Sequence, residues 1–307
     1  MAVYNNILET IGATPLVRLN KIESKYNLNV NIYAKLESFN PANNVKTRPA
    51  YYMIKKLYED NIIDETYKLI EASSGNTGIG LAMVGAYLGN EVTIVMPDSV
   101  SKERTEVLKL YGARVILTPG DLGMTGANDF VKKMTLEENK AIQPSQFTNE
   151  NNPFSHYETT AKEIEKDLNK VDYVFATIGT GGTITGIGKY FKESGYNIKI
   201  IGIEPENSPV ITKGISGKHK IQGIGPGFIP EIYNNNFVDE VITVSDEDAY
   251  EMTKMLPRIE GISAGISSGA CLKAAINYVK KHNVKFKNIV VIFPDSGEKY
   301  FSTGVFN

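Results

Sequence analysis

Residues 173–183 read YVFATIGTGGT, a short apolar and β-branched run that passes directly into a glycine-rich turn. The next residues, ITGIGKYFKES (184–194), carry apolar side chains at the spacing of an amphipathic helix. A strand that turns tightly into a helix is the repeating unit of a parallel sheet with right-handed crossovers. We therefore expect an α/β fold whose ligand sites lie at the turns beyond the carboxyl ends of strands.

The same alternation of strand and helix patterns extends along most of the chain. Short β-branched runs predict strands at Val30–Ala34, Lys68–Glu71, Val92–Met96, Arg114–Leu117, Tyr173–Ile178, Lys199–Ile203 and Asn288–Phe293. Apolar periodicity predicts helices at Arg48–Asp60, Gly78–Leu88, Lys102–Tyr111, Tyr157–Leu168, Thr183–Ser194, Asp246–Glu260 and Gly269–His282. Because single cores stop growing at roughly 250–300 residues, the 307-residue chain is expected to form two lobes with parallel or mostly parallel sheets and flanking helices.

Composition excludes several classes of protein. The net charge of −2 gives no electrostatic reason to expect nucleic acid or an anionic membrane as a partner. The single cysteine, Cys271, excludes an internal disulfide framework and a cysteine-based metal cluster, and we expect no metal. The first residues lack the pattern of a signal peptide, and no run approaches the ~20 apolar residues of a membrane helix. A cytoplasmic protein is expected.

The turn Gly179–Thr183 has the features of a phosphate-binding loop. Glycines at a strand-to-helix turn expose backbone N–H groups at the positive end of the helix dipole. The dinucleotide fingerprint fails because Ile184 occupies its last glycine position, which argues against a nicotinamide-dependent oxidoreductase. The phosphate loop of nucleotide hydrolases fails because Ile187 stands where lysine is required. The alternative is a tight turn that needs small residues only for packing.

Two further turns combine hydroxyl, amide and glycine residues before a helix. Ser73-Ser74-Gly75-Asn76-Thr77-Gly78 follows the strand that ends at Glu71, and its donors converge where an anion could bind. Its alternative interpretation is a cluster of helix-capping residues, although a cap needs only one of them. Gly265-Ile266-Ser267-Ser268-Gly269 also precedes a helix, and by itself an ordinary serine cap explains it as well.

Lys46 lies after the turn-forming stretch Asn40–Asn44 and just before the helix expected from Arg48. Most lysines are solvated surface charges. Desolvation and a helix N-terminus would both lower the pKa of this amine, and a lysine must lose its proton before it can attack a carbonyl group. Lys46 is therefore a candidate covalent attachment point for a carbonyl cofactor.

Taken together and in this order, these segments resemble the cysteine synthase (O-acetylserine sulfhydrylase) family of fold-type II pyridoxal-phosphate enzymes, and the related catalytic core of cystathionine β-synthase. The resemblance covers nearly the whole chain. Its motifs are Ile11–Leu19, Val45-Lys46, Ser74–Gly78, Gly179–Thr183, His219–Gly225, Ala264–Gly269 and Pro294–Tyr300. The expected architecture is that of the β subunit of tryptophan synthase.

The resemblance implies a role for each motif. Lys46 would bind pyridoxal 5′-phosphate covalently and act as the general base at Cα of the substrate. The cofactor phosphate would be held by Gly179, Thr180, Gly181, Gly182 and Thr183. Asn76 would bond the ring hydroxyl, and Ser267 would face the ring nitrogen with a neutral hydroxyl. The substrate would be bound by Ser73, Ser74, Thr77, Gln146 and Gly225.

The resemblance also implies a two-lobed homodimer. Residues 41–149 would form a smaller, mobile lobe that carries the carboxylate turn, and residues 1–40 with 150–307 a larger lobe that carries the phosphate loop. The expected reaction is β-replacement on a small amino acid, from O-acetyl-L-serine and sulfide to L-cysteine and acetate.

Three departures from the family pattern leave other reactions open. Ser73 stands where threonine is usual, Asn43-Asn44 where Gly-Ser or Phe-Ser is usual, and Pro226 where a small residue is common. All three are expected near the pocket for the β-substituent. One alternative is a lyase that releases sulfide from cysteine and forms serine or a thioether, and another is a cystathionine β-synthase-like activity. A non-catalytic module that binds small anions is the remaining alternative, and retention of Lys46 argues against it.

Overall fold

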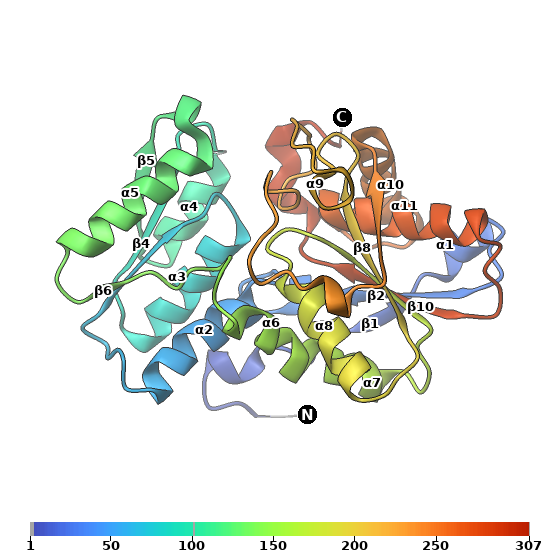
Figure 1. Cartoon of the computed structure of the whole chain (residues 1–307), viewed down its shortest axis with the longest axis horizontal. Coiled ribbons are helices and arrows are strands. Elements are labelled where there is room, and N and C mark those ends of the chain that lie inside the picture. Colours follow the sequence, from blue (N-terminus) through green and yellow to red (C-terminus); the bar gives the residue numbers. More distant parts are fainter. Residues whose placement is uncertain (1–2, 101, 307) are drawn as a thin grey trace. The chain divides into compact units, whose positions relative to one another are not determined.

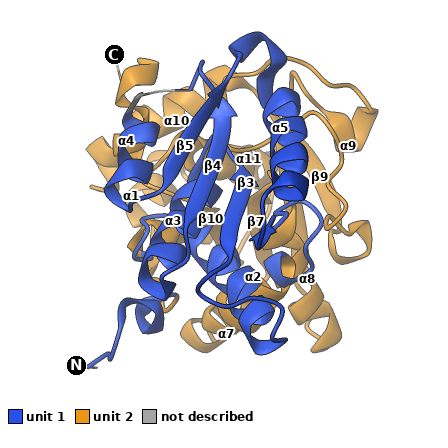
Figure 2. Cartoon of the chain, turned by 90° about the vertical axis from the view of Figure 1, so that its left-hand side faces the viewer, with its two compact units in different colours: residues 1–11, 40–152 blue, residues 12–39, 153–307 orange. Residues whose placement is uncertain are grey.

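The computed structural model describes residues 3–100 and 102–306 of the chain (Figure 1). The chain folds into two compact units, coloured separately in Figure 2. Unit 1 comprises Met1–Ile11 and Asn40–Asn152, and unit 2 comprises Gly12–Phe39 and Pro153–Asn307. The lobes expected from the sequence differ from these units mainly in one segment, because residues 1–11 were expected in the larger lobe. Leu8 and Ile11 instead pack into the core of unit 1.

Unit 1 is built on a four-stranded sheet with the order β5-β4-β3-β6, in which all neighbouring strands run parallel. The strands are β3 (Lys68–Ala72), β4 (Val92–Pro97), β5 (Arg114–Thr118) and β6 (Ala141–Ile142). The helical segments are η1 (Ile7–Thr10), α2 (Thr47–Glu59), α3 (Asn76–Leu88), α4 (Lys102–Leu110), η3 (Gly120–Leu122) and α5 (Gly123–Glu137). The chain passes from unit 1 to unit 2 within α6 (Asn151–Ser155).

Both faces of the unit 1 sheet are covered, because successive side chains of a strand point to opposite faces. Leu69 of β3 packs into the core shared with α2 and α3, whereas Ile70 packs against Val131 of α5. Helix α3 contains Gly80, where an added Cβ would lie 2.9 Å from the carbonyl oxygen of Lys46. The glycine thus allows α3 to lie directly against the start of α2.

Unit 2 is built on a six-stranded sheet with the order β1-β2-β10-β7-β8-β9, in which only the β1–β2 pair is antiparallel. The strands are β1 (Leu16–Arg18), β2 (Asn31–Leu36), β7 (Tyr173–Thr177), β8 (Lys199–Pro205), β9 (Glu240–Val244) and β10 (Asn288–Phe293). The α-helices are α1 (Asn20–Lys25), α7 (Lys162–Asp167), α8 (Gly182–Glu193), α9 (Val210–Lys213), α10 (Asp246–Ile259) and α11 (Ile266–Lys281). The remaining helical turns are η2 (Glu37–Phe39), the π-helical η4 (His156–Ala161), η5 (Asn235–Phe237) and η6 (Gly297–Thr303).

The central strands of unit 2 are apolar on both faces, as expected for parallel strands between two helical layers. Phe175 of β7 faces the core that contains α10 and α11, and the adjacent Val174 faces the core that contains α7 and α8. Figure 1 shows α11 and α8 on opposite faces of this sheet. The observed α/β architecture with mostly parallel sheets confirms the fold class expected from the sequence.

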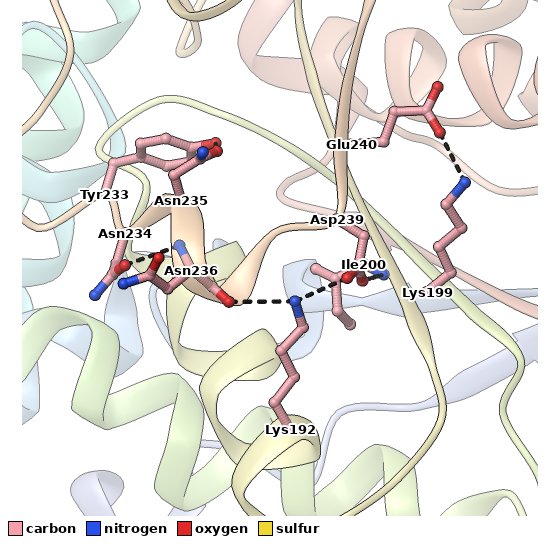
Figure 3. A network of polar contacts seen from close by, with 9 residues as sticks. All are labelled: Lys192, Lys199, Ile200, Tyr233, Asn234, Asn235, Asn236, Asp239 and Glu240. Atoms are coloured by element: carbon pink, nitrogen blue, oxygen red, sulfur yellow. Dashed lines mark hydrogen bonds and ion pairs between the residues drawn. The ribbon is translucent and has the colours of Figure 1, made fainter.

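Strand β9 closes one edge of this sheet and is held there by charged groups (Figure 3). Lys199 of β8 lies 2.8 Å from the carboxylate of Glu240. Asp239, just before β9, lies 2.8 Å from Lys192 and accepts a hydrogen bond of 2.7 Å from the backbone N–H of Ile200. These contacts add to the parallel backbone pairing of β9 with β8, which the sequence analysis did not predict.

No helix among residues 3–100 and 102–306 is long and apolar enough to cross a membrane.

Candidate active site

In unit 2, the glycine-rich turn joins the end of β7 to the first turn of α8. Gly182 is the first residue of α8, a helix of 12 residues, so the N–H groups of its first turn have no partners within the helix. Gly181 caps the helix with φ +84°, a conformation that L side chains rarely adopt. The turn therefore presents backbone donors at the positive end of a helix dipole, which is the arrangement expected for an anion site.

Backbone packing explains why this turn needs glycine. An added Cβ at Gly179 would lie 2.4 Å from the carbonyl oxygen of Gly223, and one at Gly181 would lie 2.8 Å from Cβ of Tyr233. Gly225, expected at the substrate site, donates its N–H to the carbonyl oxygen of Ile178 at 3.0 Å. The segment Gly223–Gly225 and the glycine-rich turn thus pack directly against each other within unit 2.

A buried histidine supports the end of the loop. Nε2 of His156 lies 3.1 Å from Oγ1 of Thr183, and Nδ1 lies 2.9 Å from Oγ1 of Thr160. His156 begins the π-helical turn η4 and is fully buried. This contact restricts the rotation of the Thr183 hydroxyl. Thr183 is the last residue of the predicted loop Gly179–Thr183.

Ser267 lies in the first turn of α11 and is 4% exposed. The preceding Gly265 donates its N–H to the carbonyl oxygen of Asp295 at 3.0 Å. An added Cβ at Gly265 would lie 2.0 Å from Oδ1 of Asp295, so only glycine fits there. The last two motifs of the sequence therefore meet at the start of α11.

In unit 1, the turn Ser73–Thr77 joins β3 to α3. Oγ of Ser73 accepts hydrogen bonds from the N–H groups of Gly75 (3.3 Å) and Gly78 (3.1 Å). The Ser73 oxygen thus shapes the turn itself, a task that either serine or threonine can perform. The carbonyl oxygen of Ser74 accepts a hydrogen bond from Arg104 of α4. Asn76 is half-buried at the first position of α3.

The structure brings Gln146 to this turn across 69 residues of sequence. The hydroxyl of Thr77 donates to Oε1 of Gln146 at 2.6 Å, and both side chains are buried. Oε2 of Glu71, in the preceding strand, accepts hydrogen bonds from the N–H groups of Ser145 (2.8 Å) and Gln146 (3.3 Å). The predicted residues Thr77 and Gln146 are therefore directly hydrogen-bonded, in unit 1, at the turn that Ser73 shapes.

Lys46 lies at the N-cap position of α2, which begins at Thr47, one residue earlier than expected. Its N–H donates to Oδ1 of Asn44 at 2.8 Å, and its carbonyl oxygen accepts from the N–H of Ala50 at 3.0 Å. Burial lowers the pKa of Lys46 from 10.5 to about 8. The lowered pKa has the physical cause that a nucleophilic lysine requires, namely the loss of solvation of the charged form.

Asn43 and Asn44, which depart from the family pattern, have local explanations. Asn43 has φ +54°, a conformation that asparagine tolerates better than most residues. Oδ1 of Asn44 accepts a hydrogen bond from the N–H of Lys46, and its Nδ2 donates to the carbonyl oxygen of Ala42 at 2.6 Å. Both hydrogen bonds lie within the loop that carries Asn44. Its expected place near the β-substituent pocket stays a prediction. Pro226 is exposed and lines a small cavity with Phe228.

Sequence reasoning missed Glu71, Arg104 and His156, which contact the predicted residues. A signal was present for Glu71, because a carboxylate inside the apolar run Lys68–Ala72 calls for a specific set of donors. Arg104 and His156 lie in helical segments where a polar residue is ordinary. Only the tertiary structure brings them to the two turns.

The chain is similar to known proteins along nearly its whole length. Residues 7–295 match the family model described as pyridoxal-phosphate dependent enzyme. Cysteine synthase B of Campylobacter jejuni is 44% identical over 307 residues, which cover 100% of both chains.

Two solved structures share the fold. A hydrogen sulfide-producing enzyme from Fusobacterium nucleatum has a TM-score of 0.93 and 46% identity, with 97% of this chain and 100% of that chain covered. Cysteine synthase of Entamoeba histolytica has a TM-score of 0.95 and 41% identity, with 99% and 91% covered. Since the family model spans most of the chain, including Lys46 and the turns Ser73–Thr77 and Gly179–Thr183, the protein belongs to the family of pyridoxal-phosphate-dependent enzymes.

Proposed function

We propose that this protein is a cysteine synthase, which converts O-acetyl-L-serine and sulfide into L-cysteine and acetate. In this reaction the C–O bond at Cβ breaks, acetate leaves, and sulfide forms the new C–S bond. The observation that carries the proposal is Lys46, which lies at the N-cap of α2 with its pKa lowered by burial, in a chain that matches cysteine synthase B from end to end.

The residues fit the cofactor of the family. The turn Gly179–Thr183 offers backbone donors at the start of α8, and a Cβ at Gly179 or Gly181 would collide with neighbouring backbone or side-chain atoms. A phosphate monoester is the kind of anion that such a helix N-terminus binds. Bound pyridoxal phosphate supplies delocalisation of the negative charge that develops at Cα of the substrate. Lys46 would hold the cofactor, with Asn76 assigned to the ring hydroxyl and Ser267 to the ring nitrogen.

The side chains of unit 1 would bind and activate the amino acid. The turn Ser73–Thr77 and Gln146 would bind the α-carboxylate through hydroxyl, amide and backbone donors. The neutral amine of Lys46 would accept the proton from Cα and return it after the new bond has formed. A lysine with an ordinary pKa of 10.5 would be mostly protonated near pH 8, and only a small fraction of it could accept this proton.

The pH dependence of cofactor capture tests the lowered pKa. The rate at which the apoenzyme takes up pyridoxal phosphate should rise with pH, with a midpoint near 8 instead of near 10.5, because only the neutral amine of Lys46 reacts. Stopped-flow absorbance of apoenzyme mixed with cofactor measures this rate between pH 6.5 and 10. A midpoint near 10 would contradict the burial of the amine.

Carboxylate binding tests the turn. The substitutions Thr77→Ala and Gln146→Ala should each weaken amino-acid binding by about 1.5–3 kcal/mol, the cost of losing a hydrogen bond to a charged group. Titration of the holoenzyme with L-alanine, which lacks a leaving group, measures the affinity. Thr135→Ala is a matched control, because its hydroxyl bonds Val131 within α5 of the same unit. Parental affinity in both test variants would place the carboxylate elsewhere.

Product analysis decides the function. Purified enzyme incubated with O-acetyl-L-serine and sulfide should form L-cysteine, and sulfide release from L-cysteine alone should be slower. A ratio in the opposite direction would overturn the choice of reaction while leaving the cofactor assignment intact.

The second candidate is a lyase that releases sulfide from L-cysteine. It is favoured by one observation, the 46% identity to the hydrogen sulfide-producing enzyme of Fusobacterium nucleatum. Water or a thiol would then replace sulfide at Cβ and give L-serine or a thioether. Steady-state rates of sulfide release, measured with and without an added thiol, distinguish this reaction from cysteine synthesis.

A cytoplasmic homodimer is proposed from the family resemblance. Its mass in solution should correspond to two chains of 33.8 kDa, as measured by light scattering.

A further inference from the structure

Glu71 is a buried carboxylate placed directly before the carboxylate turn. It is the penultimate residue of β3 and is 2% exposed. Oε1 accepts hydrogen bonds from Nε2 of Gln143 and from the N–H of Ala72, both at 3.1 Å. Oε2 accepts from the N–H groups of Ser145 and Gln146. Within the described part of the chain, all four of these donors are neutral.

Burying a carboxylate without a cation is costly, and the direction of its pKa reflects this cost. Burial raises the pKa of Glu71, and the donors of Gln143, Gln146 and Ser145 oppose the rise. If the only need were to fill space in an apolar strand, leucine would do so without this cost. The four donors therefore point to a specific task for the carboxylate.

The segment that Glu71 binds is locally strained. Ser145 has φ +62°, a conformation that costs an L residue free energy and persists only when neighbouring contacts impose it. The N–H of this residue makes the 2.8 Å hydrogen bond to Glu71. The turn after β6 is thereby tied to the strand that leads into Ser73–Thr77.

Gln146 is consequently held at three places. Its N–H bonds Glu71, its carbonyl oxygen accepts from Nδ2 of Asn152 at 2.8 Å, and its side-chain oxygen accepts from Thr77 at 2.6 Å. The contact with Thr77 uses Oε1, so the amide nitrogen is the end that can donate to a ligand; it lies 3.5 Å from the carbonyl oxygen of Ala72, at the limit of a hydrogen bond. Glu71 thus determines where this donor is presented.

We propose that Glu71 is a positioning residue for the substrate α-carboxylate, which acts by holding the Ser145–Gln146 backbone so that the Gln146 amide is presented at the Ser73–Thr77 turn. The inference rests on the proposed carboxylate site and adds to it a residue that does not touch the substrate. Substitution of Glu71 should therefore change amino-acid affinity through Gln146 and leave cofactor retention intact.

The test uses the holoenzyme and titration with L-alanine. Glu71→Leu keeps the bulk of the side chain and removes both acceptors, and should weaken L-alanine binding by about tenfold or more. The KM for O-acetyl-L-serine should rise by a similar factor, with a smaller change in kcat. Glu71→Gln keeps one oxygen for Ser145 and Gln146 and should recover most of the affinity.

Two comparisons separate positioning from general support of the fold. In a Gln146→Ala background, Glu71→Leu should cause little further loss of affinity, because the group it positions is already absent. Glu138→Leu is the matched control: this carboxylate bonds Lys68 at the other end of β3, and its loss should leave L-alanine affinity unchanged. Cofactor absorbance should be the same in all variants.

Three results would overturn the inference: an undiminished effect of Glu71→Leu in the Gln146→Ala background, loss of the cofactor together with the affinity, or parental affinity in Glu71→Leu. If Glu71→Leu does not fold, Glu71→Asp replaces it, since the shorter side chain withdraws the acceptor but keeps the charge. If Thr77→Ala and Gln146→Ala bind L-alanine like the parent, the carboxylate site itself fails. If they lose affinity and the Glu71 variants do not, only the role of Glu71 fails.

Discussion

Lys46→Ala should lose nearly all turnover, by roughly 100- to 10,000-fold or more, because the general base that acts at Cα is removed. Borohydride reduction of the parent holoenzyme should fix pyridoxal phosphate on Lys46, as mapped by peptide mass spectrometry. The variant should still bind the cofactor non-covalently, since the phosphate loop lies in unit 2 and is unchanged. Its absorbance should shift to that of the free aldehyde.

The control is Lys56→Ala, which removes another lysine from α2. Lys56 is exposed and pairs with Asp60 one turn later, so its loss should alter neither turnover nor the reduced adduct. A borohydride adduct that maps to any other lysine would refute the assignment of Lys46.

Gly181→Val should abolish tight retention of the cofactor. The residue has φ +84°, and its Cβ would lie 2.8 Å from Cβ of Tyr233, so a β-branched side chain strains the loop and displaces its backbone donors. We expect at least about a tenfold loss of pyridoxal-phosphate affinity in dialysis and fluorescence titration, since more than one charge-assisted hydrogen bond is misaligned. The free energy of unfolding should fall by about 1–3 kcal/mol from the backbone strain.

Gly195→Val separates these two effects. Gly195 follows α8 with φ +77°, and no atom lies within 4 Å of an added Cβ. This variant should carry a similar backbone strain but keep the parental cofactor affinity. Equal cofactor affinity in the two variants would mean that the loop does not bind the phosphate.

The sequence predicted the interior of the fold better than its edges. The strands β2, β3, β4, β7, β8 and β10, which it identified, lie inside their sheets and are apolar and β-branched because most of their side chains are buried. The edge strand β5 was also identified, from its run Val115-Ile116-Leu117. The strands that it missed are β1, β6 and β9, and each lies at the edge of its sheet. Strands β1 and β6 span only three and two residues, too few for an alternating or β-branched pattern to stand out. Strand β9 has a β-branched sequence, and nothing in the structure explains why it was missed.

All but one of the expected helices form as single α-helices, with boundaries within a few residues of those expected. The helix expected at Tyr157–Leu168 forms as a π-helical turn, η4, followed by α7. Apolar periodicity cannot reveal this local widening, which sets His156 beside Thr183. Helix α5 was missed because its first turn contains Gly123 and Gly126, which are poor helix formers.

By itself, the sequence determined the α/β class, the two glycine- and hydroxyl-rich turns, and a lysine just before a helix. These features follow from local rules: the alternation of apolar residues, the steric freedom of glycine and the capping of helix ends. Only the tertiary structure determined the solvation of Lys46 and the long-range contacts of Gln146, which local rules do not describe. The lowered pKa of Lys46 arises from burial, and the contact of Thr77 with Gln146 and the hold of Glu71 on Gln146 join residues about 70 positions apart. Solvation and hydrogen bonding depend on which atoms are neighbours in space, and only the folded chain brings these atoms together.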